Sequence, residues 1–170
     1  FLYVGRYERL KGVEELTQAI KLLSKGKDFE FHFVGPIPNQ VKIGAKNVYY
    51  HGAVSDSGRL RAVIESMDCL VCPSYSEGMP NVIIEAMSRG LMIIATDVGA
   101  INMLVSKNNG FLLEKCSVDE ISSAMQRTCE LSAEELQTLK GNSHEFAKVN
   151  LGWDSVAEKL IEKLAEITGS

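Results

Sequence analysis

Short apolar runs alternate with segments of helical periodicity along this 170-residue chain. This alternation is typical of βαβ units, in which a helix connects two parallel strands. Several runs are apolar at every position, which indicates that helices cover both faces of the sheet. We therefore expect an α/β domain with a Rossmann-like, open, mostly parallel sheet. The six expected strands are Phe1–Gly5, Phe29–Gly35, Val48–Gly52, Asp68–Pro73, Leu91–Thr96 and Gly110–Leu113.

Helices are expected between and after these strands. Apolar residues recur at helical spacing in Lys11–Ser24, so this segment should pack on the sheet. Ser117 and Ser132 are each followed three residues later by Glu, which predicts a capping box at each helix start. No repeat or flexible linker interrupts the pattern, so residues 1–170 are interpreted as one domain. The other expected helices are Gly58–Met67, Pro80–Ser88, Val118–Leu131, Ala133–Lys148 and Asp154–Ile167.

Charge and hydropathy restrict the partners of the chain. The formal net charge of −4 disfavours nucleic acid, because binding a phosphate backbone needs clustered Lys and Arg. No apolar stretch approaches the roughly 20 residues of a membrane-spanning helix. The chain begins at Phe1, inside an expected strand and without an initiator Met or signal-peptide pattern, so we expect it to be cut from a longer protein.

The Cys69-Leu-Val-Cys72 spacing invites a metal or redox interpretation. No second CxxC and no His pair at zinc-finger spacing accompany it, and both residues fall in an apolar strand. Free cysteine in such a strand behaves as a small apolar residue. We interpret Cys69, Cys72, Cys116 and Cys129 as structural, which favours a reducing compartment.

Ligands of open parallel sheets bind beyond the carboxyl ends of the strands, so the residues that follow each strand are the candidate site. Arg6 follows the first strand, and Lys11 stands five residues later at a helix start. Two cations at one strand–helix turn can bind the two ends of a diphosphate, although two solvated surface charges would give the same pattern.

Two carboxylates, Glu77 and Glu85, follow the fourth strand. On one continuous helix they would point about 80° apart, so they converge only if Glu77 lies in the loop. Pro80 supports this geometry, because proline favours the first position of a helix. Glu85 then lies inside an apolar helix and should have a polar partner. The free amides of Gly78 and Met79 offer an anion site at the helix start.

Taken together, these motifs resemble the donor domain of glycosyltransferase family 4, retaining enzymes with the GT-B fold. Val4-Gly5-Arg6 with Lys11-Gly12 is similar to the first-strand signature of that family. Glu77-x7-Glu85-Ala-Met-x-x-Gly90 resembles the double-glutamate motif of the family. Asn47–Gly52 resembles the segment that lines the nucleotide base, and Trp153 with the helix that follows resembles the closing element of the family. The resemblance implies that the chain is the carboxyl-terminal half of a GT-B enzyme whose amino-terminal acceptor domain is absent.

The resemblance implies a role for each matching residue. Arg6 and Lys11 would bind the diphosphate, Glu77 the hydroxyls of the transferred sugar, and Glu85 the ribose. The catalytic residues would be Arg6, Lys11 and Glu77, with no metal and no cofactor. The implied donor-binding residues are Gly5, His51, Gly52, Gly78, Met79, Pro80, Asn81 and Glu85.

The resemblance also implies the partners: a nucleotide sugar, with a uridine diphosphate hexose favoured by the Glu-Gly-Met-Pro form, and a glycan or lipid-linked acceptor. The full-length enzyme would be cytoplasmic, with peripheral association at the cytoplasmic membrane face as a further expectation. The isolated domain would be inactive, because the family places its active site between two domains.

The sequence departs from the family pattern at two positions. Met103 stands where the family often has Glu, and Pro80 removes one amide that could meet a phosphate. Met103 keeps an alternative open, a non-catalytic module that binds a nucleotide sugar or a protein. His51 as an edge of the base pocket has its own alternative, a partly buried ring, and His32 is interpreted as a satisfied core histidine.

Other nucleotide-binding classes fit the sequence less well. The chain has neither Gly-x-Gly-x-x-Gly after the first strand nor a P-loop motif. It has no Asp-x-Asp pair to hold a divalent ion on a diphosphate, and Arg6 stands where a phospho-acceptor receiver domain would need acidic residues.

Overall fold

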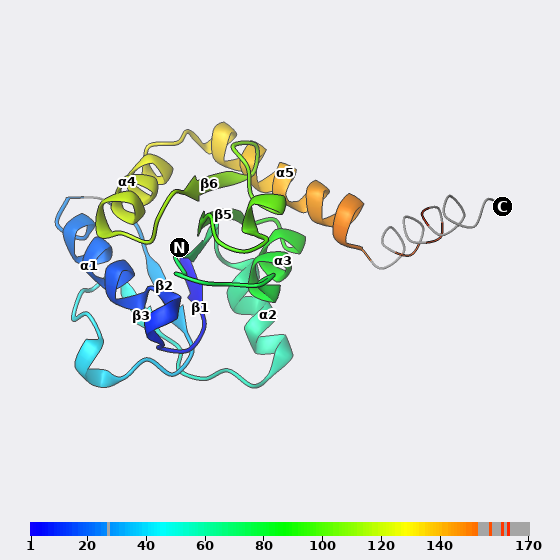
Figure 1. The fold of residues 1–170 in the computed structure, drawn as a ribbon. Coiled ribbons are helices and arrows are strands. Elements are labelled where there is room, and N and C mark those ends of the chain that lie inside the picture. Colours follow the sequence, from blue (N-terminus) through cyan, green and yellow to red (C-terminus); the bar gives the residue numbers. More distant parts are fainter. Residues whose placement is uncertain (27, 153–156, 158–160, 162, 164–170) are drawn as a thin grey trace.

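The computed structural model describes residues 1–26 and 28–152, together with 157, 161 and 163, and it contains one open sheet. Every neighbouring pair of strands is parallel, so the predicted six-stranded α/β sheet is confirmed. In space the strands follow the order β3-β2-β1-β4-β5-β6 (Figure 1). Their bounds are β1 Leu2–Val4, β2 Phe31–Val34, β3 Val48–Tyr50, β4 Cys69–Cys72, β5 Met92–Thr96 and β6 Gly110–Leu113.

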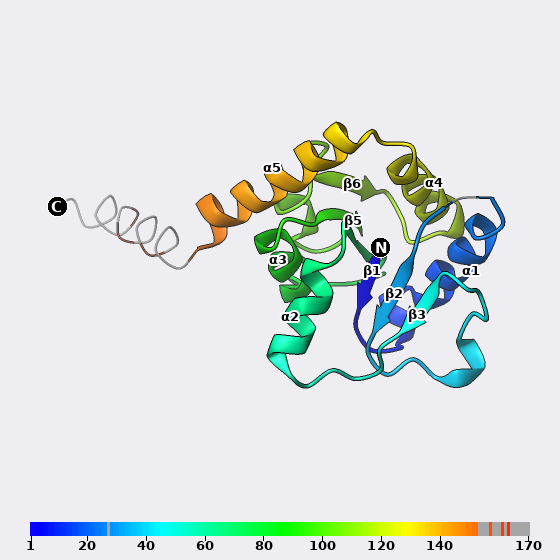
Figure 2. The ribbon, with the colours of Figure 1, turned by 180° about the vertical axis from the view of Figure 1, so that it is seen from behind.

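Helices cover both faces of this sheet, as Figures 1 and 2 show from opposite sides. Helices α1 (Val13–Leu23) and α4 (Val118–Cys129) pack against each other on one face. The other face carries α2 (Ser57–Glu65), α3 (Asn81–Ser88) and α5 (Ala133–Leu151). Three short 3-10 turns lie in the connections: η1 Arg9–Lys11, η2 Asn39–Val41 and η3 Ile101–Met103.

The core consists of two apolar layers separated by the sheet. Because successive side chains of a strand point to opposite faces, Leu2 joins the layer under α3 while Tyr3 joins the layer under α1. Phe31 and Phe33, from alternate positions of β2, pack with tilted rings whose centroids are 4.7 Å apart, in the layer under α1. Burial on both sides explains why these strands are apolar at nearly every position.

The strand order creates a single topological switch point. From β1 the chain moves outward through β2 to β3, then returns to β4 and moves the other way through β5 to β6. The loops that follow β1 and β4 therefore run in opposite directions and open a crevice between them at the carboxyl edge of the sheet.

Three expectations about helix starts need correction. The first helix begins at Val13 instead of Lys11, because Gly12 adopts φ 66° and separates it from η1. Pro80 precedes α3 as its N-cap and is not its first residue. Ser132 forms the expected capping box, but at Ser117 only half of one forms, because the Glu120 carboxylate accepts from the Lys115 amide.

Part of the predicted carboxyl-terminal segment cannot be compared with the structure. Trp153 and the expected helix Asp154–Ile167 lie outside the described residues, apart from isolated positions. Within the described part of the chain, no helix is both long and apolar enough to cross a bilayer.

The Cys69-x-x-Cys72 pair is structural, as expected. Both residues are in β4, both are buried, and they occupy opposite core layers, so they do not form one site. Burial raises the pKa of the Cys69 thiol to about 12 and that of Cys72 to about 11. At neutral pH both remain protonated and unreactive.

We predict that iodoacetamide at pH 8 alkylates Cys69 and Cys72 at least about 100-fold more slowly in the folded protein than in urea, because only the thiolate reacts. The folded-state rate should rise as the pH approaches 11, where the thiolates form. Peptide mass spectrometry after timed quenching measures both rates. Equal rates in native buffer and urea would contradict the burial of the pair.

Candidate functional site

The loops after β1 and β4 meet at the switch point through direct backbone contact. The Tyr75 amide donates to the Leu10 carbonyl at 2.8 Å. Gly12 lies so close to Pro73 that a Cβ would overlap the Pro73 carbonyl oxygen, and φ 66° disfavours a side chain there in any case. The position needs glycine for both reasons, and the contact brings the residues on either side of it together.

The first pair brought together in this way is Lys11 and Glu77. Lys11 Nζ lies 2.8 Å from Glu77 Oε1, and the two residues are 66 positions apart in the chain. Ser74 donates its hydroxyl to the same oxygen at 2.6 Å. The Glu77 side chain is only 10% exposed, so its negative charge is held by one ion pair and one short hydrogen bond.

A cleft of about 550 Å³ opens between the loops after β1 and β4. Its polar wall contains Arg6, Lys11, Ser74 and Glu77, and Gly5 forms part of its floor. The loops after β2 and β3, α2 and the start of α3 also line the cleft, mostly with apolar side chains. These residues are Pro36, Ala53, Val54, Leu60, Pro80, Asn81 and Val82. Of the two cations and two carboxylates expected around one crevice, both cations and Glu77 line this cleft, and Glu85 does not.

Arg6 stands at the mouth of the cleft. Its side chain is 76% exposed and forms an ion pair with Glu8 at 3.1 Å. The backbone beneath it is held by the Tyr3 hydroxyl, which donates to the Arg6 carbonyl at 2.8 Å. Burial raises the pKa of Tyr3, so this hydroxyl remains a proton donor at any physiological pH. The guanidinium itself is free to turn toward an anion, because an exposed ion pair is worth at most about 1 kcal/mol.

The backbone at Gly5 lies close to the Tyr3 side chain and to Gly35. A Cβ at Gly5 would lie 2.7 Å from the Tyr3 hydroxyl, and one at Gly35 would overlap the Gly5 carbonyl. The exits of β1 and β2 are thus packed backbone to backbone, which leaves room for the cleft above them.

Glu85 does not lie as expected. It is exposed on α3, does not line the cleft, and its carboxylate receives no hydrogen bond from the described residues. The helix is amphipathic, with Ile83, Ala86 and Met87 in the core and Glu85 on the opposite side. Apolar neighbours in the sequence therefore did not imply that Glu85 is buried. Asn81, one turn earlier on the same face of α3, lines the cleft, so Glu85 lies just beyond it.

Four other residues expected to bind the donor do not line the cleft: His51, Gly52, Gly78 and Met79. Gly52 is exposed with φ 68°, and its carbonyl accepts from the Gly35 amide. Gly78 and Met79 are exposed in the loop before α3. Within the described chain, the amides of these two residues donate no hydrogen bond, so both can still meet an anion.

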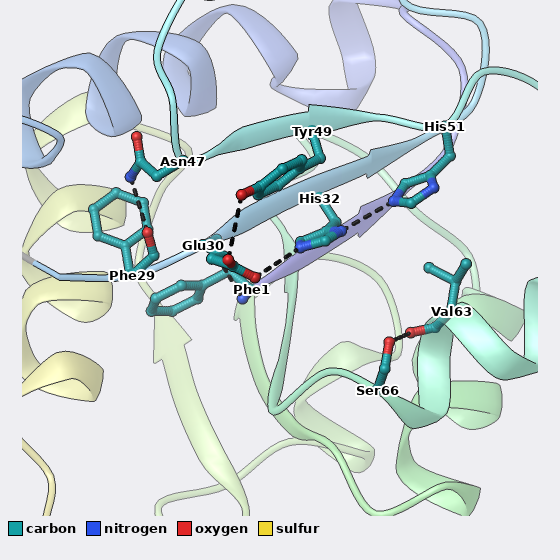
Figure 3. A network of polar contacts seen from close by, with 9 residues as sticks. All are labelled: Phe1, Phe29, Glu30, His32, Asn47, Tyr49, His51, Val63 and Ser66. Atoms are coloured by element: carbon teal, nitrogen blue, oxygen red, sulfur yellow. Dashed lines mark hydrogen bonds and ion pairs between the residues drawn. The ribbon is translucent and has the colours of Figure 1, made fainter.

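His51 belongs to a row of polar rings on one face of β2 and β3 (Figure 3). Its Nε2 lies 2.9 Å from His32 Nδ1, and His32 Nε2 lies 3.4 Å from Glu30. Tyr49 stacks on His32 and donates to the other oxygen of Glu30 at 3.3 Å. Partial burial lowers the pKa of His32. His32 is satisfied, as expected, but it is half-buried and not a core residue.

The loop after β5 closes the far side of the Glu77 loop. Gly99 adopts φ 61°, and a Cβ there would overlap the Glu77 carbonyl. The Ala100 amide donates to the Gly78 carbonyl at 2.9 Å. Met103, at the position where the resemblance implies Glu, is 67% exposed.

Among the described residues, no cluster of three His, Cys, Asp or Glu side chains could hold a metal ion.

Comparison with known proteins assigns the chain to a family. Residues 1–130 match the family model described as glycosyl transferases group 1. The chain belongs to the group 1 glycosyltransferases. TuaC of Bacillus subtilis, which is named for teichuronic acid biosynthesis, is 36% identical over 126 residues, covering 74% of this chain and 32% of TuaC. CapM of Staphylococcus aureus, named for capsular polysaccharide biosynthesis, is 31% identical over 136 residues, covering 74% of this chain and 35% of CapM.

Solved structures of glycosyltransferases share the fold. The C-terminal domain of LpcC, a group 1 family protein from Francisella tularensis, superposes with a TM-score of 0.78 at 20% identity, covering 89% of this chain and 86% of that domain. Anabaena HepE in complex with UDP gives 0.77 at 20% identity, covering 98% of this chain and 49% of HepE. This group 1 glycosyltransferase chain spans about a third of the length of TuaC and CapM.

Several cleft residues of this glycosyltransferase domain were not predicted from the sequence, among them Val54, Leu60 and Ser74. Val54 and Leu60 carry no chemical signal, because only the sheet twist and the path of α2 bring them to the cleft. Ser74 had a weak signal: it follows the fourth strand and precedes Glu77 by three residues, the spacing at which a serine can reach a carboxylate across a turn.

We predict that Gly12→Ala lowers the free energy of unfolding by about 1–3 kcal/mol or more, through overpacking against Pro73 and left-handed backbone strain. The same substitution at Gly26 should change it by less than about 0.5 kcal/mol, since a Cβ there meets nothing within 4 Å. Urea denaturation followed by circular dichroism compares them. A Gly12→Ala protein as stable as the Gly26→Ala protein would contradict the contact between the loops.

Proposed function

We propose that this domain binds a nucleotide sugar in the switch-point cleft and forms the donor-binding half of a retaining GT-B enzyme of family 4. The observation that carries the proposal is the convergence of Arg6, Lys11 and the partly buried Glu77 on one cleft. Because the chain spans about a third of its curated relatives, a second domain of the full-length protein is proposed to hold the acceptor.

The polar wall suits a sugar diphosphate. Lys11 and Arg6 supply positive charge for the diphosphate, and hydrogen bonds between charged groups contribute about 1.5–3 kcal/mol each. The amides of Gly78 and Met79, at the start of α3, add neutral donors for the phosphate oxygens. Glu77 is an acceptor only, which suits sugar hydroxyls and repels phosphate. Asn81 and Glu85 extend the polar surface along α3, where the ribose is proposed to lie.

The proposed transfer needs no nucleophile from this domain. The bond between the anomeric carbon and the diphosphate oxygen breaks, and its electron pair goes to the diphosphate. Arg6, Lys11 and the α3 amides stabilise that developing charge, which they can do better in the transition state than in the ground state. The acceptor hydroxyl attacks the cationic sugar from the same face and gives its proton to the departing phosphate, so the configuration is retained.

A uridine diphosphate hexose is the proposed donor. HepE, whose fold this chain shares, was crystallised with UDP, and one curated relative, from Mycolicibacterium hassiacum, is named an alpha-(1->4)-mannosyltransferase. The names of TuaC and CapM support a glycan or lipid-linked acceptor. We further propose a cytoplasmic enzyme with peripheral attachment to the membrane and no metal requirement.

A non-catalytic module is the second candidate, and Met103 is the observation that favours it. Met103 is an exposed apolar side chain where the resemblance implies a carboxylate, and Met79, in the loop before α3, is exposed as well. Exposed apolar side chains of this kind suit a protein contact as well as a ligand. In that case the cleft would bind a nucleotide sugar without turnover in the full-length protein.

Calorimetry with UDP, GDP and ADP, each alone and as its hexose derivative, tests the proposed function. We expect one nucleoside diphosphate and its sugar to bind the isolated domain, and no transfer to occur without the second domain. Absence of heat with all six compounds would reject the nucleotide-sugar site. Binding without turnover by the full-length protein, whatever the acceptor, would favour the non-catalytic module.

We predict that Lys11→Ala and Arg6→Ala each weaken nucleoside diphosphate binding by about 10- to 100-fold, the loss expected for one charge-assisted hydrogen bond. In the full-length enzyme they should lower kcat further, because diphosphate charge grows in the transition state. Lys21→Ala, which removes an exposed cation of α1 remote from the cleft, is the matched control and should leave binding unchanged. Equal effects of Lys11→Ala and Lys21→Ala would show that the binding site does not lie at Lys11.

A further inference from the structure

Ser74 is buried beside Glu77, and its hydroxyl has a defined hydrogen-bond partner. It lies two residues beyond β4 with only 1% of its surface exposed. Its Oγ donates to Glu77 Oε1 at 2.6 Å and lies 3.8 Å from Cys72 Sγ, behind it in the core. A buried hydroxyl with these neighbours has little freedom to turn away from the carboxylate.

The two donors to Glu77 converge on one oxygen. Lys11 Nζ and Ser74 Oγ both contact Oε1, at 2.8 and 2.6 Å. Within the described part of the chain, Oε2 receives no hydrogen bond, although Glu77 lines the cleft. A carboxylate with one oxygen occupied and the other available is oriented to accept hydroxyl groups of a ligand.

The two donors differ in what a ligand would do to them. Lys11 ends a flexible side chain, which is one third exposed, and its ammonium is attracted to any diphosphate in the cleft. Each hydrogen bond that the Lys11 ammonium donates to a phosphate oxygen weakens its contact with Glu77. Ser74 is buried and uncharged, so its bond to Oε1 does not compete with the diphosphate.

We propose that Ser74 is a positioning residue for recognition of the transferred sugar: it holds Glu77 in place when the diphosphate engages Lys11, so that Oε2 can accept the sugar hydroxyls. This inference rests on the proposed function, since it assigns the diphosphate to Lys11 and the sugar to Glu77. It separates two tasks within one cleft, because removing the Ser74 hydroxyl affects the sugar and leaves the diphosphate contacts in place.

The test compares Ser74→Ala with Ser76→Ala, an exposed serine of the same loop, in the full-length protein. Calorimetry measures affinity for UDP and UDP-glucose, GDP and GDP-mannose, and ADP and ADP-glucose. For the pair that the unmodified protein binds, Ser74→Ala should lose about 10- to 100-fold in affinity for the sugar form, because Glu77 loses the one donor that the diphosphate does not attract and no longer holds Oε2 in place for the sugar hydroxyls. Its affinity for the nucleoside diphosphate should change less than about threefold. Ser76→Ala should match the unmodified protein with both.

Two further variants guard against a purely structural effect. Ser74→Thr keeps the hydroxyl and should restore most of the preference for the sugar form. Glu77→Gln should lose that preference, and adding Ser74→Ala to it should cost little more, because both changes remove the same contact. Thermal unfolding of each variant is measured alongside binding.

Each outcome decides between the inference and the proposed function. If the unmodified protein binds none of the six compounds, the proposed function fails and the inference fails with it. If it binds and Ser74→Ala keeps the sugar preference, only the inference is overturned. Equal losses for both forms, or an unfolded Ser74→Ala protein with an equally unfolded Ser74→Thr protein, would assign Ser74 a structural role and overturn the inference as well.

Discussion

The site depends on one steric constraint, the contact between the backbone at Gly12 and the Pro73 carbonyl. No side chain fits between them, so the loops after β1 and β4 touch at the point where the sheet changes direction. That contact brings a lysine and a glutamate from distant parts of the chain within 2.8 Å. Gly99 provides a second such contact, against the Glu77 carbonyl, and holds the carboxylate loop from its other side.

The charges in the cleft are balanced before any ligand arrives. Glu77 is partly desolvated and would be costly to bury alone, but Lys11 and Ser74 satisfy one of its oxygens. Arg6, by contrast, stands in solvent at the mouth, with only an exposed ion pair to Glu8. The cleft therefore has an exposed cation, Arg6, at its mouth and an ion pair, Lys11 with Glu77, inside. An incoming dianion would meet Arg6 first and would then compete with Glu77 for Lys11.

The sequence was a good guide where a residue type has one physical use. Apolar runs without polar faces could only be strands covered on both sides, and a proline after a strand exit placed Glu77 in a loop before α3. It misled where neighbours in sequence were taken for neighbours in space. Glu85 is flanked by apolar residues yet lies on the outer face of α3. Gly12 has a left-handed backbone, so the first helix begins at Val13 and not at Lys11 as expected. Helical periodicity and backbone angle, not local composition, decided both.

From the sequence alone came the α/β class, the six strands, and the expectation that Arg6, Lys11 and Glu77 lie at strand exits around one cleft, because strand exits and charged residue types are encoded locally. Only the tertiary structure decided that Lys11 reaches the same oxygen of Glu77 as Ser74, and that Val54 and Leu60 line the cleft. Those facts depend on contacts between loops that lie far apart in the sequence, and no local pattern encodes such contacts.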